Sequence, residues 1–446
     1  MTDVNPAAPS IASLEAGGIE TVIGTVVNPA GLTLAKTVPL RRVTTFADPG
    51  LGASPVWHVF TIDQTGIAFT DALGVVGDER IRIDLTELRT LGDGLAWAPG
   101  SFFDQHGVPV PTCSRGALQR IEQSLCDAGF AALFGHEIEF LLVGPDGEAL
   151  PSTLWAQYGL AGVLEHEGFI RDVTTTAAGA GIGIEQFHPE YGRNQFEVSL
   201  SPLSPVAAAD QLVVMRLIIG RVARRYGVRV CFSPVPFAGG VGSGAHQHFS
   251  LSRQGSPVFS GGSGVNGLTE AGEHAIGGIL AGLPEAQGIF SGSIVSGQRM
   301  QPGFWAGATI CWGTENREAA IRFLADGPGN PHGANVEVKV IDPSANPYFV
   351  SALILGLALH GVEDAGTLPP EITVDPASLS GDQRLPVLPT DQAAVISALD
   401  NSSLVRGILG DAAVDATVAV RRYEHDTYAD LEPAQLADRF RMAWSV

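Results

Sequence analysis

The chain has 446 residues, 45% of them apolar, which is enough to bury the cores of two or three domains. Its formal net charge of −21 argues against nucleic acid or an anionic membrane as the main partner. Lys36 and Lys339 are its two lysines, and neither stands in the Gly-x-x-x-x-Gly-Lys-Ser/Thr pattern of a P-loop. The four cysteines lack C-x-x-C spacing, so neither a zinc site nor a redox pair is expected.

No segment has the features of an export signal or a membrane span. The opening MTDVNPAAPS lacks the basic and apolar stretches of a signal peptide. The longest apolar run, at 348–362, is interrupted and too short to cross a bilayer. We therefore predict a soluble, cytoplasmic protein.

The first hundred residues have the pattern of a small β-rich unit that follows a disordered tail at 1–10. Segments rich in β-branched residues and separated by turn signals predict strands at 19–28, 57–62 and 80–85. A stretch rich in proline and glycine, 97–116, is typical of a linker. Ser114 is then placed to cap a helix over 115–129.

Strands and helices alternate in the larger part of the chain. The predicted strands are 131–143, 181–190, 194–202, 228–237, 244–252, 313–324 and 334–343, the second and third forming a hairpin. The predicted helices are 205–226, 346–364 and most of the last hundred residues. Glycine-rich stretches at 239–244 and 261–267 read as loops, without the G-x-G-x-x-G pattern of a dinucleotide site.

Acidic side chains stand inside strands that otherwise have the pattern of core. Glu137 and Glu139 are two residues apart, so a strand places both on the same face. Two like charges in a core cost several kcal/mol each unless something compensates them. Carboxylate oxygens with an occasional imidazole suit Mg²⁺ or Mn²⁺, which would turn each buried acid into a ligand. Further candidates of this kind are Glu190, Glu197, Glu337, His246 and His248.

Each of these residues alone has an ordinary alternative. A single glutamate could lie at an open strand end or pair with an arginine, and His248 could be a hydrogen-bonded core histidine. Arg299, Arg317 and Arg322 strengthen the set, because guanidinium groups bind phosphates and carboxylates. Arg317 could instead pair with a neighbouring acid, Glu315 or Glu318. Metals and arginines without a P-loop indicate an ATP-using ligase with a different phosphate cradle.

Taken together, these motifs resemble the glutamine synthetase family over nearly the whole chain. The matching stretches, in the family's order and at about its spacing, are GHEIEFLL, EQFHPEYGRNQFEVS, GSGAHQHFS, ENREAAIRF and VEVKVIDPSANPYF. The resemblance implies an α+β fold, with an N-terminal β-grasp domain at 11–106 and a catalytic domain at 107–446 built on a curved antiparallel sheet with helices. It also implies a homo-oligomeric double ring, usually a dodecamer, with active sites between subunits.

The resemblance assigns roles position by position. The ligands of the metal that organises glutamate are Glu139, Glu190 and Glu197. The ligands of the metal that bridges the ATP phosphates are Glu137, His246 and Glu337. The substrate glutamate is contacted by Arg299, with His246, Gly242 and Lys339 beside it. The nucleotide and its phosphates are contacted by Arg317, Arg322, Ser250 and His248. Asp63 aligns loosely with an acid that a neighbouring subunit supplies to the amine site.

The implied reaction activates a poor electrophile. ATP converts the glutamate side chain to an acyl phosphate, while metals and arginines stabilise the transferring phosphoryl group. An amine then displaces phosphate to give an amide, and a nearby acid takes the proton of the amine.

Three positions depart from the family pattern. A flap glutamate that helps to bind ammonium is replaced by Trp305, which could line a pocket for a larger amine or could be only flap packing. Lys339 stands where the family has an arginine, and Val241 where it often has an asparagine. We therefore predict an ATP-dependent ligase that joins the γ-carboxylate of glutamate to an organic amine, first among them a polyamine. The alternatives are a glutamine synthetase that uses ammonium and a non-catalytic, ring-forming relative.

Overall fold

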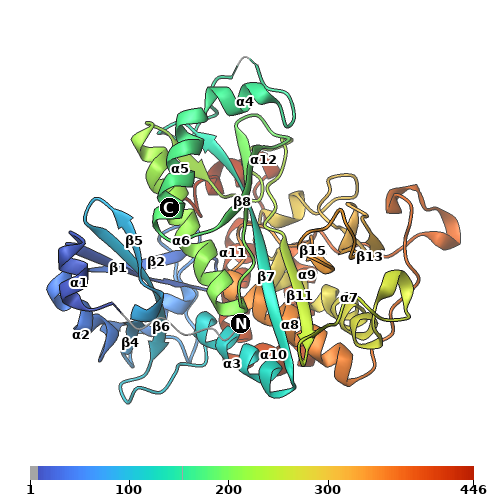
Figure 1. The fold of residues 1–446 in the computed structure, drawn as a ribbon, viewed down its shortest axis with the longest axis horizontal. Helices are drawn as coiled ribbons and strands as arrows, with labels where there is room; N and C mark the ends of the chain where they lie inside the picture. The colour runs from blue at the N-terminus through green and yellow to red at the C-terminus, as the bar shows by residue number, and fades with distance from the viewer. Residues whose placement is uncertain (1–8, 153) are drawn as a thin grey trace.

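The computed structural model describes residues 9–152 and 154–446, which build two β-sheets and a set of helices (Figure 1). Of the tail expected at 1–10, residues 1–8 lie outside the described residues. Ser10 accepts a hydrogen bond from the backbone N–H of Ser13 at 3.1 Å and so caps the first helix. The elements of the N-terminal part are α1 (Ile11–Ala16), β1 (Thr21–Val27), β2 (Thr33–Pro39), α2 (Val43–Ala47), β3 (Leu51–Ala53), β4 (Glu79–Ile83), β5 (Arg89–Gly92) and β6 (Leu95–Phe103).

The smaller sheet has the order β2-β1-β6-β4-β3, with β5 also paired to β6. Its central strands β1 and β6 run parallel. The interpretation of 97–116 as a linker was wrong for residues 97–103, because they belong to β6, the middle strand, which buries Ala98 and Phe102. The strand expected at 57–62 was also wrong: Pro55–Val59 is a 3₁₀ helix that begins at a proline.

The larger sheet has the order β13-β14-β15-β11-β7-β9-β8, and it is curved and antiparallel except for the pair β13–β14. Its long strands β7 and β11 lie side by side in the middle of the molecule (Figure 1). The strands are β7 (Phe130–Val143), β8 (Ile184–Pro189), β9 (Gln195–Leu200), β10 (Arg229–Cys231), β11 (Gln247–Arg253), β12 (Ser256–Pro257), β13 (Thr309–Thr314), β14 (Ala319–Leu324) and β15 (Asn335–Val338).

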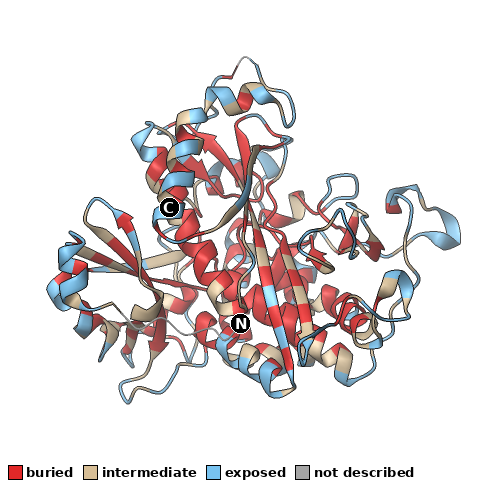
Figure 2. Cartoon of the chain, viewed as in Figure 1, coloured by how far each residue is buried: buried red, intermediate tan, exposed pale blue. Residues whose placement is uncertain are grey.

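Helices pack against this sheet. The buried residues concentrate on its central strands and on the helices packed against them (Figure 2). Helix α8 is apolar on nearly all sides and lies against α7, α3 and α6 in the core. No helix within the described ranges is long and apolar enough to span a membrane. The helices are α3 (Ser114–Asp127), α4 (Leu160–Glu165), α5 (Glu167–Gly179), α6 (Pro205–Arg225), α7 (Glu270–Phe290), α8 (Pro347–Glu363), α9 (Gln392–Asp400), α10 (Ser403–Leu409), α11 (Asp411–Tyr428) and α12 (Pro433–Phe440).

Several helices differ from the sequence prediction, and α1, α2, α4 and α5 were not predicted. Helix α3 is capped by the Cys113 side chain, whereas the Ser114 hydroxyl donates to the carbonyl of Val27 at 2.9 Å. Helix α7 was not predicted, although Thr269 caps it and Glu270 and Glu273 occupy its first turn. Its glycines allow close helix packing, because a Cβ on Gly278 would lie 2.5 Å from the carbonyl oxygen of Leu357 in α8.

Candidate active site

Four adjacent strands bring the predicted acids onto one face of the larger sheet. Glu137 and Glu139 project from β7, and the strand period of two places both on that face. Glu139 lies directly opposite Glu197 of β9 in the sheet register. His248 of β11 lies directly opposite Glu337 of β15. Antiparallel register therefore gathers residues that are up to 200 positions apart in the chain.

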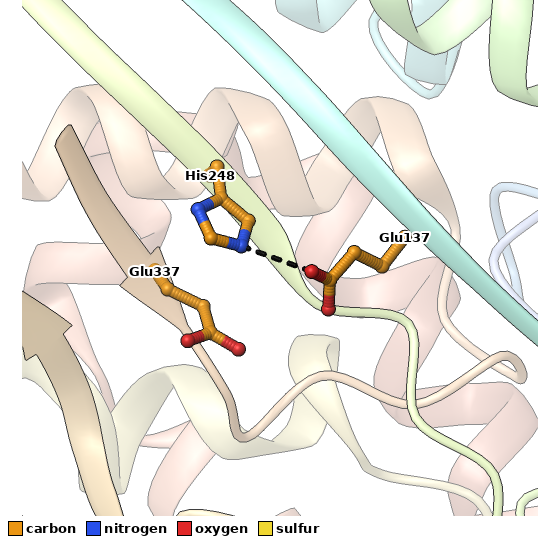
Figure 3. A group of neighbouring side chains, drawn as sticks. All are labelled: Glu137, His248 and Glu337. Carbon is orange, nitrogen blue, oxygen red and sulfur yellow. Dashed lines mark hydrogen bonds and ion pairs between the residues drawn. The ribbon is translucent and has the colours of Figure 1, made fainter. Parts of the chain in front are cut away.

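The first cluster combines Glu137 and Glu337 with two histidines. His248 Nε2 lies 3.2 Å from a Glu137 oxygen, and the dashed line in Figure 3 marks this contact. His246 Nδ1 lies 2.9 Å from the other Glu137 oxygen and 3.3 Å from Glu337. Asn335 fixes the ring of His248 through a 2.9 Å contact at Nδ1. Burial alone would raise the pKa of Glu137, but the hydrogen bonds and charges of His246 and His248 hold it well below its usual range.

Two cations complete this cluster. Lys339 Nζ lies 3.0 Å from Glu337, and Arg322 Nη1 lies 3.2 Å from the other oxygen of the same carboxylate. Burial would raise the pKa of Glu337, yet the charges of Lys339, His248 and His246 together lower the pKa to about 2. Arg322 also binds Glu315 at 2.6 Å. The first cluster is therefore well supplied with positive charge.

The second cluster, formed by Glu139, Glu190, Glu197 and His188, is short of positive charge. His188 lies 3.2 Å from Glu197 and 3.5 Å from Glu190. Burial raises the pKa of Glu197 to about 8, with Glu137 and Glu139 adding to the effect. Burial and the charge of Glu139 also raise the pKa of Glu190. Three acids thus share one histidine, which is the electrostatic condition that a bound cation relieves.

Both clusters fit a hard divalent cation. One ligand atom each from Glu137, His248 and Glu337 lie within 4.8 Å of one another, and the same holds for His188, Glu190 and Glu197. The donors are carboxylate oxygens and imidazole nitrogens, which suit Mg²⁺ or Mn²⁺. Compared with the sequence prediction, the first group has His248 where His246 was expected, although His246 touches both acids of that group.

A buried arginine and a glycine loop border the clusters. Arg299 places Nη2 3.2 Å from His246 Nε2. The Gly242 carbonyl accepts a hydrogen bond from Gln195 at 2.9 Å, and Gln195 also contacts Glu139 at 3.2 Å. A Cβ on Gly244 would lie 2.5 Å from His246, 2.7 Å from Glu139 and 2.9 Å from Arg299, so a side chain there would displace these three groups.

A cavity of about 230 Å³ adjoins the first cluster. Glu137, His248 and Ser250 line it, together with Asn335 and His332 from β15 and the loop before it. Two of the four residues that the resemblance gives to the nucleotide, His248 and Ser250, therefore line one cavity beside Glu137.

Two predicted residues lie away from the clusters. Arg317 is exposed and makes no hydrogen bond or ion pair in the described part of the chain, so pairing with Glu315 or Glu318 does not occur. Asp63 of the N-terminal sheet region is bonded to Tyr423 and Tyr428 of α11 at 2.9 and 2.5 Å. Within one chain, Asp63 thus links the N-terminal part to the C-terminal helices.

Trp305 lies on the flap, defined here as residues 300–307, which follows Arg299. Its side chain is 47% exposed and its backbone has φ of 53°, in the left-handed region. Glu318 accepts the backbone N–H of Trp305 at 3.1 Å. The aromatic ring is therefore available to a molecule that enters from solvent.

Three residues of the site, His188, Gln195 and Gly244, were not predicted from the sequence. A signal for His188 was present, because it stands two residues before Glu190, and a spacing of two places side chains on one side of an extended segment. Gln195 and Gly244 carry no such signal, since their roles depend on a side-chain contact and a close approach between separate strands.

Comparison with known proteins agrees with this geometry. The family model of the glutamine synthetase catalytic domain matches residues 111–436. The chain belongs to the glutamine synthetase family. It is 37% identical to the gamma-glutamylpolyamine synthetase GlnA3 of Streptomyces coelicolor over 95% of this chain and 93% of that protein. It is 30% identical to the glutamine synthetase of Pyrococcus abyssi over 73% of this chain and 74% of that protein.

The same family appears among solved structures. A crystal structure described as a novel glutamine synthase homolog superposes with a TM-score of 0.85 at 27% identity, covering 96% of this chain and 99% of that one. This member of the glutamine synthetase family is therefore an enzyme, a glutamate–amine ligase that forms a carbon–nitrogen bond. The α+β fold predicted from the motifs is confirmed. ATP and divalent metals are used in the family generally.

Proposed function

We propose that the enzyme joins the γ-carboxylate of glutamate to an organic amine, in particular a polyamine, through an ATP-dependent γ-glutamyl phosphate. The observation that carries the proposal is an apolar, exposed Trp305 on a flap beside two complete acid clusters. Where the family has a flap glutamate suited to ammonium, this chain offers an aromatic ring that attracts alkyl ammonium groups. The likeness to a gamma-glutamylpolyamine synthetase supports the same choice.

In this proposal the two acid clusters hold Mg²⁺ or Mn²⁺. The metals would supply charge neutralisation for the phosphates of ATP and for the carboxylate of glutamate. Glu137, Glu337 and a histidine, His246 or His248, would bind the first, and the second would lie among Glu139, Glu190, Glu197 and His188. The raised pKa values of Glu190 and Glu197 support a cation there, because those acids lack sufficient positive partners.

We predict that Glu197→Gln removes most of the stabilisation by Mg²⁺. A cation at about 100 times its Kd stabilises a folded protein by about 2.7 kcal/mol. The pKa of Glu197 lies above its unfolded value, so ionising this acid destabilises the metal-free fold as pH rises from 4.5 toward 8. Glutamine avoids that loss, and we expect the metal-free variant to be at least as stable as the parent at pH 7.5.

Thermal melting with EDTA and with increasing Mg²⁺ or Mn²⁺ measures both effects. Glu167→Gln, on the exposed first turn of α5, is the control and should respond to metal like the parent. An undiminished metal response in Glu197→Gln would contradict the assignment of this cluster.

The remaining roles follow from charge and position. Arg299, buried beside His246, would bind the α-carboxylate of glutamate. Arg322 and Lys339 would stabilise the phosphoryl group in transfer, since both already point at Glu337 in the first cluster. The amine nitrogen then attacks the acyl carbon, the bond to phosphate breaks, and an acid of the second cluster or Asp63 of a neighbouring subunit accepts the proton.

The direct test is product formation by purified enzyme with ATP, glutamate and Mg²⁺. Ammonium, ethanolamine, putrescine, spermidine and spermine are compared, with phosphate release and mass spectrometry as readouts. Turnover with polyamines and little with ammonium supports the proposal. Turnover with ammonium alone makes the enzyme a glutamine synthetase, and no ATP turnover with any amine favours the non-catalytic alternative.

We predict that Trp305→Glu shifts amine preference toward ammonium. A carboxylate on the flap binds a small cation, while the loss of the ring removes apolar and cation–π contacts from a larger amine. We expect the ratio of kcat/KM for polyamine to that for ammonium to fall about tenfold or more, as for the loss of a pocket contact of 1–3 kcal/mol.

The control for this change is Phe304→Glu, which adds the same charge to the neighbouring exposed flap residue. It should leave the amine ratio near that of the parent. An unchanged ratio in Trp305→Glu would reduce Trp305 to flap packing.

We also propose a homo-oligomeric double ring in the cytoplasm, with active sites shared between subunits. Several large apolar side chains are exposed in the single chain, among them Val76, Leu154 and Leu160. Burial of such groups between subunits would remove them from water. Mass photometry would give the number of subunits.

A further inference from the structure

The flap begins and ends on active-site residues. Arg299, immediately before it, contacts His246. At its far end, a Cβ on Gly307 would lie 2.9 Å from Cβ of Lys339 and 3.0 Å from Cα of Ala320, so the flap backbone packs closely on Lys339. Movement of the flap between these two points therefore changes the entrance to the site.

The middle of the flap is held by a single side chain, that of Glu318. Its two carboxylate oxygens accept the backbone N–H groups of Gly303 at 3.2 Å and Trp305 at 3.1 Å. Phe304 makes only a turn bond to Gln301 within the flap. Among the described residues, no other hydrogen bond ties 302–306 to the rest of the protein.

Glu318 itself stands on a fixed turn. Its backbone N–H donates to Asn316 Oδ1 at 3.2 Å. The Asn316 amide in turn donates to the carbonyls of Ile372 and Val374 at 2.9 and 3.0 Å. Glu318 directly precedes β14, which pairs in the sheet. The flap is thus the less constrained partner of this contact, and Glu318 is the more constrained one.

The contact favours one flap conformation that would otherwise be costly. Trp305 has a positive φ, which residues with a side chain adopt rarely unless neighbouring contacts hold them there. A carboxylate that accepts hydrogen bonds from two backbone N–H groups stabilises such a conformation, because hydrogen bonds to a charged acceptor are stronger than those between neutral groups.

We propose that Glu318 is a positioning residue that latches the flap and places Trp305 at the amine entrance, which deepens the proposed function and rests on it. Water can replace the carboxylate at both N–H groups, so the latch opens to admit the amine. When the latch is closed, it also limits the access of water to the acyl phosphate. In an open site, water attacks the acyl carbon, the bond to phosphate breaks, and glutamate and inorganic phosphate form without amide product.

The structural arm of the test is hydrogen exchange of the full-length protein, read by mass spectrometry on peptides covering 300–307. Glu318→Ala should speed exchange there about tenfold or more, as expected for lost bonds to a charged acceptor. Glu318→Gln keeps one acceptor oxygen and should be intermediate. Glu371→Ala is the matched control, because Glu371 accepts the N–H of Thr314, at the end of β13, at 2.9 Å and has no flap hydrogen bond among the described residues. Unchanged exchange in Glu318→Ala would overturn the latch.

The functional arm compares phosphate release with amide product. Glu318→Ala should raise the KM for the amine about tenfold and increase phosphate release without product, while the KM for ATP stays that of the parent. Faster exchange with unchanged amine KM and unchanged coupling would overturn the role in amine placement. If the parent forms no product with any amine, the proposed function fails, whereas the exchange arm still decides whether Glu318 latches the flap.

Discussion

Glu337→Gln is expected to lower the rate of amide formation by about 10²–10³-fold, the effect of losing one preorganised electrostatic group. Glu337 is the carboxylate on which Lys339, Arg322 and His246 converge, at 3.0, 3.2 and 3.3 Å. Without its charge, the two cations repel each other and lose the orientation that the proposed phosphoryl transfer needs. The substitution also removes one ligand atom from the first cluster.

The same change should reduce stability in a pH-dependent way. The pKa of Glu337 is lowered to about 2, below its unfolded value, so its charge stabilises the fold above pH 4.5 and loses that effect as pH falls toward 2. The difference in melting temperature between parent and variant should therefore be full at pH 7 and narrow below pH 4.5. Circular dichroism melts over this range measure it.

Glu424→Gln is the matched control for Glu337→Gln. Glu424 is also a buried acid, and it pairs with Arg421 at 2.7 Å in α11 without contact to either cluster. This control should lose stability but keep kcat per folded molecule. Full activity in Glu337→Gln, measured on folded protein, would contradict the central role of this carboxylate.

Gly244→Ala is expected to lower kcat/KM for glutamate about 100-fold, because displacement of reacting groups by about 1 Å has effects of that size. The added methyl group would lie within 3.0 Å of His246, Glu139 and Arg299. These three side chains belong to both clusters and to the proposed carboxylate site, and all must shift to admit it. Steady-state kinetics at varied glutamate measures the loss.

Gly407→Ala, in helix α10, provides the control for the added methyl group, because nothing lies within 4 Å of a Cβ there. We expect its kinetics to equal those of the parent. If Gly244→Ala kept its kcat/KM, the loop before β11 would be more compliant than its packing indicates.

Much of the site was predictable because strand periodicity acts locally. Glu137 and Glu139 share a face by spacing alone, and the valines around Glu337 indicated a buried acid. The hairpin β8–β9 was predicted for the same reason, and helix α8 was predicted from its long apolar run. Elements whose formation depends on pairing with distant parts of the chain were not predicted. Strand β6 contains a proline and a glycine, and another glycine directly precedes it. It nevertheless becomes the centre of a sheet, because β1 and β4 pair with it.

The sequence by itself determined the family, the α+β class and the residue types that make metal and phosphate chemistry available. Only the tertiary structure decided which acids are compensated. It surrounds Glu137 and Glu337 with His248, Lys339 and Arg322, and it leaves Glu190 and Glu197 with the single imidazole of His188. It also placed Glu318 beneath the flap. The physical reason is that charge compensation depends on distances of 3 to 4 Å across strands, and register, rather than spacing along the chain, sets those distances.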